Sequence, residues 1–178
     1  MRAFFGACFC MSAAHGTMYV FYTLYLESAG YPKTLIGALW TLGVLAEIVL
    51  FLYLPRLLRR VALRALLLAS FACAVVRFPA IGWGVESLAV LACAQLLHAA
   101  TFGAFHSASV ATVHRLFPGA LAARGQALYS SIAYGLGGTA GALVAGFTWE
   151  VAGPAPSFAA SALFAAAGGA LVWRRVNV

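Results

Sequence analysis

Six long runs of apolar residues, separated by short polar gaps, account for almost all of this 178-residue chain. Crossing the hydrocarbon core of a bilayer takes about 20 residues of helix, and each run is long enough. Backbone groups in lipid must be hydrogen-bonded within the segment, so these runs are expected to be helices. The pattern predicts an all-α integral membrane protein with one transmembrane domain over residues 1–178, whose helices lie at about 3–26, 34–55, 62–83, 87–113, 121–148 and 154–173.

The charged residues are distributed unevenly among the gaps. The first, third and fifth gaps are nearly neutral, whereas the second and fourth gaps and both ends of the chain are basic. The basic residues concerned are Arg2, Arg56, Arg59, Arg60, Arg64, Arg115, Arg124, Arg174 and Arg175. Because cationic loops stay on the cytoplasmic side, the pattern predicts a multi-pass protein of the bacterial inner membrane with both termini in the cytoplasm.

Composition supports lipid as the main partner and excludes several others. The chain is 64% apolar and 8% charged, whereas soluble domains carry about a quarter charged residues. The net charge of +7 comes from loop arginines, without the aromatic interleaving of a nucleic-acid surface, so no nucleic acid is expected. The four cysteines form no Cys-x-x-Cys pair and all lie in apolar runs, so neither a disulfide, a metal site nor a cofactor is expected.

Five ionisable side chains interrupt the apolar runs. Because such residues are costly in lipid, each is a candidate for a functional role. They are His15, Glu47, Arg77, His98 and His106. A rise of about 1.5 Å per residue places the first and fourth of these near the middle of the bilayer, where transporters bind their solutes.

The expected roles follow from chemistry. Glu47 is a candidate proton carrier, and Arg77 is a candidate to tune it or to bind a carboxylate with its planar fork. For His15 and His98, solute binding or proton relay competes with a plain interhelical hydrogen bond, worth about 1 kcal/mol. All four side chains also admit a purely structural role. His106, beside two serines, favours that structural interpretation.

Aromatic side chains accompany the histidines. Tyr19 and Tyr22 share the helical face of His15 and are expected to line a pocket, although Tyr22 also suits the outer aromatic belt, as Tyr25 does. Residues 12, 15, 19 and 22 recur in type and spacing at 95, 98, 102 and 105, which places Phe102 in the position of Tyr19. This echo is typical of the inverted three-plus-three repeats of secondary transporters.

The fifth run is rich in glycine. Gly137 and Gly141 form a G-x-x-x-G step, and Gly138 begins a second ridge of small residues. Such ridges allow helices to approach closely, so these residues are predicted to serve helix packing.

Five segments resemble a known family. Residues 95–106 (QLLHAATFGAFH), 114–118 (HRLFP) and 124–131 (RGQALYSS) resemble the second half of the phenylpropionate permease family, an MFS_1-like family of the major facilitator superfamily. Residues 15–22 and 42–48 resemble its seventh and eighth helices. The resemblance covers essentially the whole chain.

The resemblance implies a proton-coupled symporter that works by alternating access. It implies a twelve-helix carrier of which this chain is the second six-helix half, paired with a missing N-terminal half or a second copy. It also implies a small organic solute such as an aromatic carboxylate, proton coupling by Glu47 and His98, and a charge partner or anion contact at Arg77. The loop at residues 54–60 departs from the superfamily because it lacks the usual glycine and aspartate.

Other functions fit less well. A truncated, non-transporting half or packing module remains open, because the wall normally supplied by the other half is absent from this sequence. Histidines at equal depth would also allow a haem-binding electron-transfer protein. An enzyme is not expected, since the chain contains neither Gly-x-Ser-x-Gly nor His-Glu-x-x-His and has no aspartate.

Overall fold

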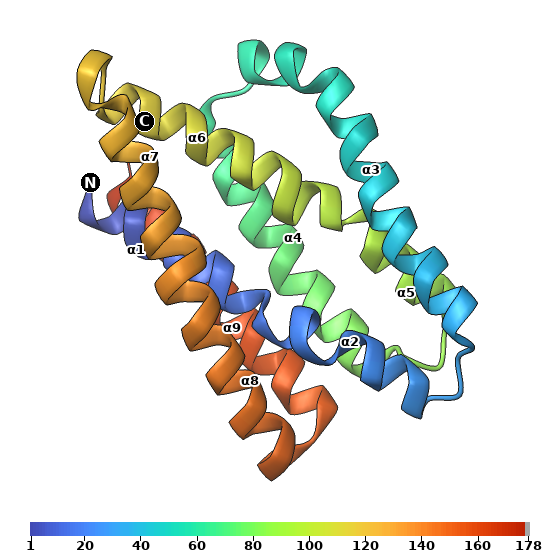
Figure 1. Cartoon of the computed structure of the whole chain (residues 1–178). Coiled ribbons are helices and arrows are strands. Elements are labelled where there is room, and N and C mark those ends of the chain that lie inside the picture. Colours follow the sequence, from blue (N-terminus) through green and yellow to red (C-terminus); the bar gives the residue numbers. More distant parts are fainter. Residues whose placement is uncertain (177–178) are drawn as a thin grey trace.

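The computed structural model describes residues 1–176, and all regular secondary structure in that range is helical. Six helical rods run back and forth and pack side by side (Figure 1). Three rods are interrupted. Their elements, in chain order, are α1 (Arg2–Ala14), α2 (Gly16–Ser28), α3 (Lys33–Arg60), α4 (Leu63–Trp83), α5 (Leu88–Leu96), the π-helix η1 (Ala99–Ala104), α6 (Phe105–Leu116), the 3-10 turn η2 (Gly119–Leu121), α7 (Ala122–Ser130), the π-helix η3 (Ser131–Gly137), α8 (Gly138–Ala152) and α9 (Pro154–Arg175).

Five of the six rods are long and apolar enough to cross a membrane, and no membrane is present in the structure. They are Arg2–Ser28, Lys33–Arg60, Leu63–Trp83, Leu88–Leu116 and Pro154–Arg175. The sixth rod, α7–η3–α8, is equally long but less apolar, because glycine, serine and tyrosine interrupt its middle. The predicted all-helical membrane fold with six helices is confirmed.

Local sequence explains the sharp turns between rods. Gly30 has φ +87° after α2, and the amides of Gly30 and Tyr31 donate to the carbonyls of Glu27 and Leu26, which closes the helix end as a Schellman motif. Gly153 has φ +83° between α8 and α9, and Pro154 begins α9. A proline in the first turn costs no helical hydrogen bond.

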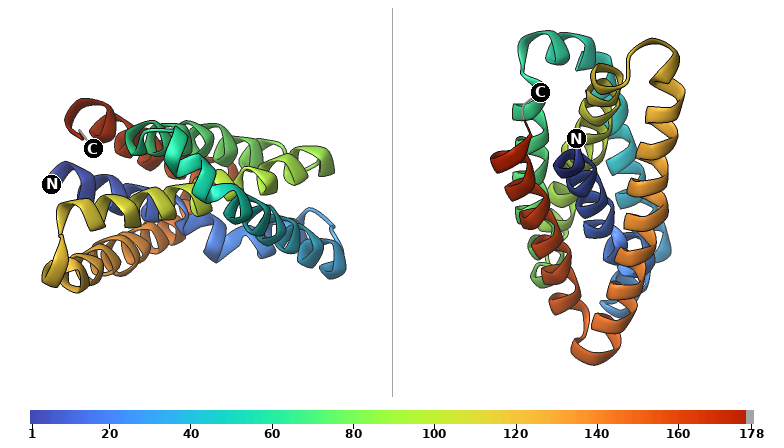
Figure 2. Two further views of the ribbon diagram at one scale, coloured as in Figure 1. Left: turned by 90° about the horizontal axis from the view of Figure 1, so that it is seen from above. Right: turned by 90° about the vertical axis from the view of Figure 1, so that its left-hand side faces the viewer.

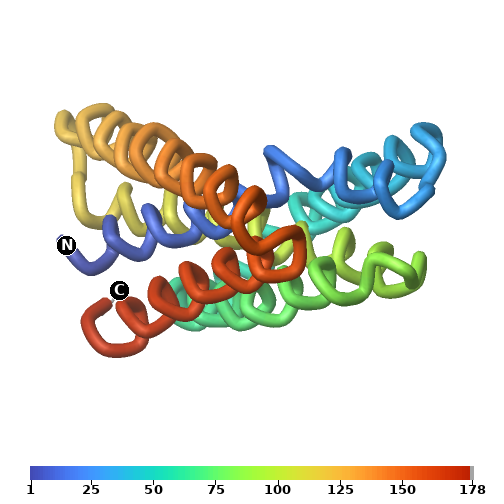
Figure 3. Tube along the Cα trace, turned by 90° about the horizontal axis from the view of Figure 1, so that it is seen from below, coloured from blue at the N-terminus to red at the C-terminus, as the bar shows by residue number. Residues whose placement is uncertain are grey.

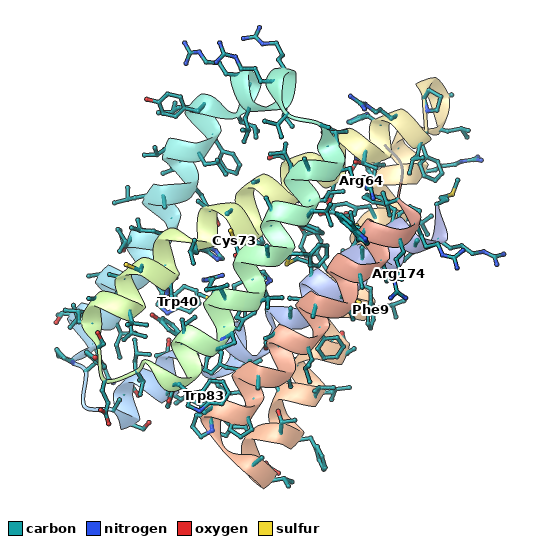
Figure 4. All side chains as sticks on the ribbon, turned by 180° about the vertical axis from the view of Figure 1, so that it is seen from behind. Phe9, Trp40, Arg64, Cys73, Trp83 and Arg174 are labelled. Carbon is teal, nitrogen blue, oxygen red and sulfur yellow. The ribbon has the colours of Figure 1, made fainter. Side chains whose placement is uncertain are left out.

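The arginine-rich connections and chain ends named above lie at one end of the bundle, whereas Arg77 lies within it. The two chain termini and the α3–α4 and α6–α7 connections lie at this end, and the other three connections lie at the opposite end (Figures 1 and 2). Figure 4 shows Arg64 and Arg174 toward this end and Trp83 toward the other. Arg64 stacks over the Trp173 ring at 5.6 Å and donates to the Trp173 carbonyl at 2.6 Å. This contact joins the start of α4 to the end of α9, so the two helices are antiparallel.

The core lies where α1, α4 and α9 pack together, and α3 lies at its margin. Helix α1 packs against α9 and η3, while α3 contacts chiefly α5 and η1. Large apolar side chains of α3, such as Leu45, Val49 and Leu52, are exposed. This is the arrangement expected when lipid or another helical unit covers that face.

The first rod bends at His15, where α1 ends and α2 begins (Figure 3). The His15 amide bonds to the carbonyl of Ser12, three residues back, which tightens the turn locally. Gly16 lies directly against the backbone of Gly141 in α8. The bend therefore coincides with the closest approach of two helices, which only glycine permits.

The predicted packing glycines differ in their surroundings. A Cβ on Gly141 would lie 2.6 Å from Ala13 Cα, and one on Gly137 would lie 2.6 Å from the Phe9 carbonyl oxygen. Gly138 has no atom within 4 Å of its Cβ position. Within residues 1–176, therefore, Gly137 and Gly141 pack against α1, and Gly138 packs against nothing.

This difference gives a stability prediction with a built-in control. Gly141→Ala is expected to lower the free energy of unfolding by about 1–3 kcal/mol, because the methyl group would push α8 away from α1. Gly138→Ala is expected to be neutral or to stabilise by about 0.5 kcal/mol, because alanine is the better helix former. Thermal unfolding of both variants in detergent tests this, and equal midpoints would contradict the assigned contacts.

Candidate functional site

The guanidinium of Arg77 occupies the centre of the bundle and is fully buried. Its Nε donates to the Ala94 carbonyl at 2.8 Å, and its Nη1 donates to Thr101 Oγ1 at 2.8 Å and faces His15 Nε2 at 3.5 Å. Its Nη2 lies 2.9 Å from Met18 Sδ and 3.3 Å from Gln95 Oε1. Four elements (α2, α5, η1 and the His15 turn) therefore converge on one side chain of α4.

Strong acceptors hold two of the N–H groups of Arg77, at 2.8 Å each, while the His15 contact is long at 3.5 Å and Met18 offers only a weakly accepting sulfur. A guanidinium has five N–H groups, and here five acceptors surround it. All five are neutral, and no carboxylate of residues 1–176 lies within 4 Å of Arg77. The site thus holds a permanent positive charge that is solvated by dipoles and has no direct counter-ion.

The contacts of His15 fix its tautomer. Its Nδ1 lies 2.9 Å from the Met11 carbonyl, which can only accept, so Nδ1 carries the proton. Nε2 is then the acceptor that faces Arg77. Since both nitrogens are engaged and a cation adjoins one of them, the geometry favours a neutral hydrogen-bonding role for His15. Neither nitrogen is free to bind a haem iron.

Glu47 and His98 form a pair across α3 and the end of α5. His98 Nε2 lies 2.9 Å from Glu47 Oε1, and the two side chains are 9% and 14% exposed. The two titratable groups approach closely, but the contact is not a hydrogen bond, because Glu47 Oε1 has no hydrogen-bond partner among residues 1–176. His98 Nδ1 is buried with no partner among residues 1–176. The pair therefore has room for one more proton.

Gly43 makes space for this pair. A Cβ there would lie 3.2 Å from Gln95 Oε1 and 3.5 Å from His98 Cδ2. Gly43 lies four residues before Glu47 and therefore on the same face of α3.

The aromatic residues divide between the interior and the edge. Tyr22 is fully buried and meets Trp40 edge-on at 5.3 Å, whereas Tyr19 is 51% exposed and stacks on His15 at 5.7 Å. Tyr25, expected in the outer belt, instead lies inside the bundle, where its hydroxyl donates to the Gly82 carbonyl at 2.8 Å. Phe102 stacks between His98 at 5.4 Å and His106 at 6.2 Å.

A second polar cluster lies beyond Phe102. His106 Nδ1 lies 3.1 Å from the Tyr129 hydroxyl and 2.8 Å from the Tyr134 hydroxyl, and the two hydroxyls are 3.3 Å apart. The sequence singled out His106 but neither tyrosine. Residues five apart face different sides of an α-helix, so their spacing gave no signal; the π-helical turn of η3 brings Tyr134 round to the face of Tyr129.

Between the Arg77 site and this second cluster lies a small cavity of about 20 Å³, enough for about one water molecule. It is lined by Cys8, Met11, Ser12, His15, Thr101, Phe102, Phe105, His106, Tyr129, Ala133 and Tyr134. The interruptions of three rods (the His15 bend, η1 and η3) all contribute to its wall. Helix irregularities of this kind are frequent at functional sites and at the binding sites of transporters.

The structure thus brings together His15, Arg77 and His98 with Glu47, and it places Phe102 and His106 on the same pocket. Tyr22 and Tyr19 lie on the α3 side, near Trp40. Within residues 1–176 no three histidine, cysteine, aspartate or glutamate side chains are grouped to hold a metal ion. The cysteines there are unpaired, and Cys93 is exposed.

Comparison with known proteins agrees with this picture. Residues 1–160 match the model of the MFS_1 like family. The chain is 36% identical over 150 residues, or 84% of its length, to the "Probable 3-phenylpropionic acid transporter" of Escherichia coli (strain K12). The match covers 39% of that relative, so the chain spans well under half of its length. No solved structure matches the chain.

The chain therefore belongs to the MFS_1 like family, a family of membrane transporters and not of enzymes. This confirms the family resemblance read from residues 95–131.

Proposed function

We propose that this chain forms the second six-helix half of a proton-coupled carrier for a small organic acid. The observation that carries the proposal is the Glu47–His98 pair beside a buried Arg77 that contacts no carboxylate of residues 1–176. The printed name of the E. coli relative supports an aromatic carboxylate as the solute. Alternating access then moves the site between the two faces of the membrane.

Charge balance gives the coupling a physical reason. With Glu47 ionised, its charge cancels that of Arg77, and the empty site is neutral. A solute carboxylate alone would add an uncompensated negative charge in a medium of low dielectric constant, which is costly. A proton on the Glu47–His98 pair offsets that charge, so proton and solute bind favourably together and leave together.

The other residues have subordinate roles in this proposal. His15 and Thr101 hold the guanidinium of Arg77 in place, and Phe102 offers a flat apolar face to the solute. Tyr19 and Tyr22 border the Glu47 side of the site. Gly137 and Gly141 keep α8 against the bend at His15.

Uptake into proteoliposomes tests the proposal. The chain is to be reconstituted with a second polypeptide that carries the part of the E. coli relative outside the matched region. Accumulation of 3-phenylpropionate is expected when the outside is more acidic than the lumen, and to collapse when a protonophore removes the gradient. Folded protein that takes up no organic acid under either condition would refute the proposal.

The isolated chain separates this proposal from its main alternatives. A solute path between two halves needs both walls, so the chain alone is expected to insert without transporting. Robust uptake by the chain alone would instead show that a second copy supplies the other wall. Absence of uptake in both assemblies would favour a non-transporting packing unit.

The arginine-rich end of the bundle is proposed to face the cytoplasm of a bacterial inner membrane. A cysteine at Arg59 is then expected to react with an impermeant maleimide only in inverted vesicles, and a cysteine at Glu150 only in intact spheroplasts. Both positions are exposed, and the four native cysteines lie within helices. Labelling of both from the same side would overturn the six-span topology.

A further inference from the structure

The basic end of the bundle carries many arginines and no side-chain carboxylate. The only acidic side chains of the chain are Glu27, Glu47, Glu86 and Glu150. Glu47 lies in the middle of α3, and the other three lie near the connections of the opposite end (Figure 1). Among residues 1–176, no arginine has a side-chain carboxylate within 4 Å. The positive charge of this end is therefore available to an anionic partner.

Two of these arginines lie together where the start of α4 meets the end of α9 (Figure 4). Arg64 Nη2 donates to the Trp173 carbonyl at 2.6 Å, and its guanidinium carbon lies 5.6 Å from the centroid of the Trp173 ring. Arg64 Nε is buried and has no hydrogen-bond partner among residues 1–176. Arg174 is the next residue of α9 and is exposed. The α4–α9 contact thus presents two guanidinium groups around one exposed indole, with donors left for an oxygen-rich anion.

The start of α1 adds charge beside this contact. A Cβ on Gly6 of α1 would lie 3.2 Å from Leu171 Cδ1 of α9, and the two chain termini lie side by side (Figures 1 and 3). Helices α1 and α9 run in opposite directions, so Arg2, one turn before Gly6, is brought to the level of Arg175, one turn after Leu171. The end of α9 is therefore surrounded by cations from three helices.

The outer face of α9 below these cations is apolar. A shallow groove of about 340 Å³ is lined by Ala160, Leu163, Phe164 and Ala167. Arg174 follows Ala167 by two helical turns, so the two residues share one face, about 10 Å apart along the helix axis. Trp173 is 67% exposed, and tryptophan is enriched at the headgroup level of a bilayer. The order along α9 is charge, indole and groove, which matches the phosphate, the glycerol esters and an acyl chain of a phospholipid.

Other occupants of this face fit less well. A second copy related by a twofold axis would bring the same arginines against one another, and like charges in contact repel. Helix α9 packs against α1, α4 and α8, whereas α3 packs against α5 and η1. The exposed faces of α9 and α3 lie on different sides of the bundle (Figures 1 and 2), so a helical partner on α3 leaves α9 open to lipid.

We propose that the α4–α9 contact at the basic end binds one anionic phospholipid, with its phosphate between Arg64 and Arg174 and one acyl chain in the α9 groove. The inference goes beyond the proposed transport function and does not depend on it. Such a lipid joins α4 to α9 in the folded state only, so it is expected to raise the thermal stability of the bundle.

Titration of the full chain in detergent with phosphatidylglycerol, and separately with phosphatidylcholine of the same acyl chains, tests this inference. Native mass spectrometry counts the bound lipids and gives the affinity for the first. Because an arginine near the surface contributes about fivefold in affinity for anionic lipid, two arginines predict a preference of about 25-fold for phosphatidylglycerol. Arg174→Gln, at an exposed position, is expected to lower that preference about fivefold. Arg64→Gln is the second variant, read only where its thermal midpoint is retained.

Arg59→Gln is the matched control, because Arg59 has the same charge at the same end but lies in the last turn of α3. Its preference is expected to equal that of the wild type. Ala167→Phe fills the groove and is expected to weaken the binding of both lipids alike. An equal loss in Arg59→Gln and Arg174→Gln would show a diffuse attraction without a site.

Two further outcomes would overturn the inference. The first is equal affinity of the folded wild type for the two lipids, which would show that the arginines do not select a headgroup. The second concerns a free anion as the ligand. If inorganic phosphate raises the thermal midpoint as much as phosphatidylglycerol does, the groove contributes nothing and the lipid assignment fails. Uptake of solute is measured separately, so failure here leaves the proposed transport function standing.

Discussion

Replacement of Glu47 by glutamine is expected to abolish accumulation of solute against a gradient, while exchange of labelled for unlabelled solute continues. Glutamine keeps the size and polarity of glutamate beside His98 but cannot gain or lose a proton. The site then carries the fixed charge of Arg77 with nothing to cancel it when empty. The acid still binds, because its negative charge makes the loaded site neutral. The empty carrier, however, cannot return across the membrane, because its site carries an unbalanced positive charge in a medium of low dielectric constant. We expect accumulation driven by a pH gradient to fall about a hundredfold, to background, by analogy with the loss of an essential proton-transfer group.

The matched control is Glu150→Gln, which removes a carboxylate of the same kind from an exposed position at the end of α8. That variant is expected to accumulate solute at the wild-type level. Proteoliposomes with an imposed pH gradient measure accumulation, and the same vesicles without a gradient measure exchange. Full accumulation by Glu47→Gln would remove Glu47 from the coupling step and transfer that role to another group.

Replacement of Arg77 by lysine is expected to destabilise the bundle by roughly 3 kcal/mol and to abolish transport. Lysine keeps the charge, but its three donors in one compact group replace five in a planar fork. At least two of the acceptors around Arg77 would lose their partners, and a buried hydrogen bond to a charged group contributes about 1.5–3 kcal/mol. The loss is expected to centre on Thr101 and the Ala94 carbonyl, which lie closest, at 2.8 Å each.

Thermal unfolding in detergent, followed by helical circular dichroism, measures this loss of stability. Arg59→Lys is the control, because Arg59 is exposed in the last turn of α3. Its midpoint is expected to match the wild type. A stable Arg77→Lys variant would show that charge alone, and not the five-donor geometry, holds the rods together at this point.

Hydropathy alone was enough to predict six helical rods, but not the interruptions at His15, η1 and η3. Lipid forces each apolar run into a helix, because no other conformation hydrogen-bonds its backbone internally. The same physics made the ionisable residues conspicuous, since Glu47 and Arg77 stand out within runs where any charge is costly. The alternation of arginines likewise predicted which connections share an end of the bundle.

The partners of those residues were harder to foresee. His98 and Glu47 lie 51 positions apart, and nothing in either helix indicates that they meet at 2.9 Å. The five-acceptor shell of Arg77 also draws on separate helices. Helical periodicity orders residues along one rod, but it carries no information on how neighbouring rods are rotated against each other.

Sequence by itself therefore determined the class of fold, the family and the short set of residues from which the site is built. Tertiary structure alone decided three things: which helices surround Arg77, that among residues 1–176 Gly138 lacks the contact made by Gly141, and that Tyr134 joins Tyr129 and His106. The last depends on a π-helical turn in η3. One turn of π-helix shifts the face of every residue after it, and packing against the bent first rod stabilises that shift where the local sequence would not.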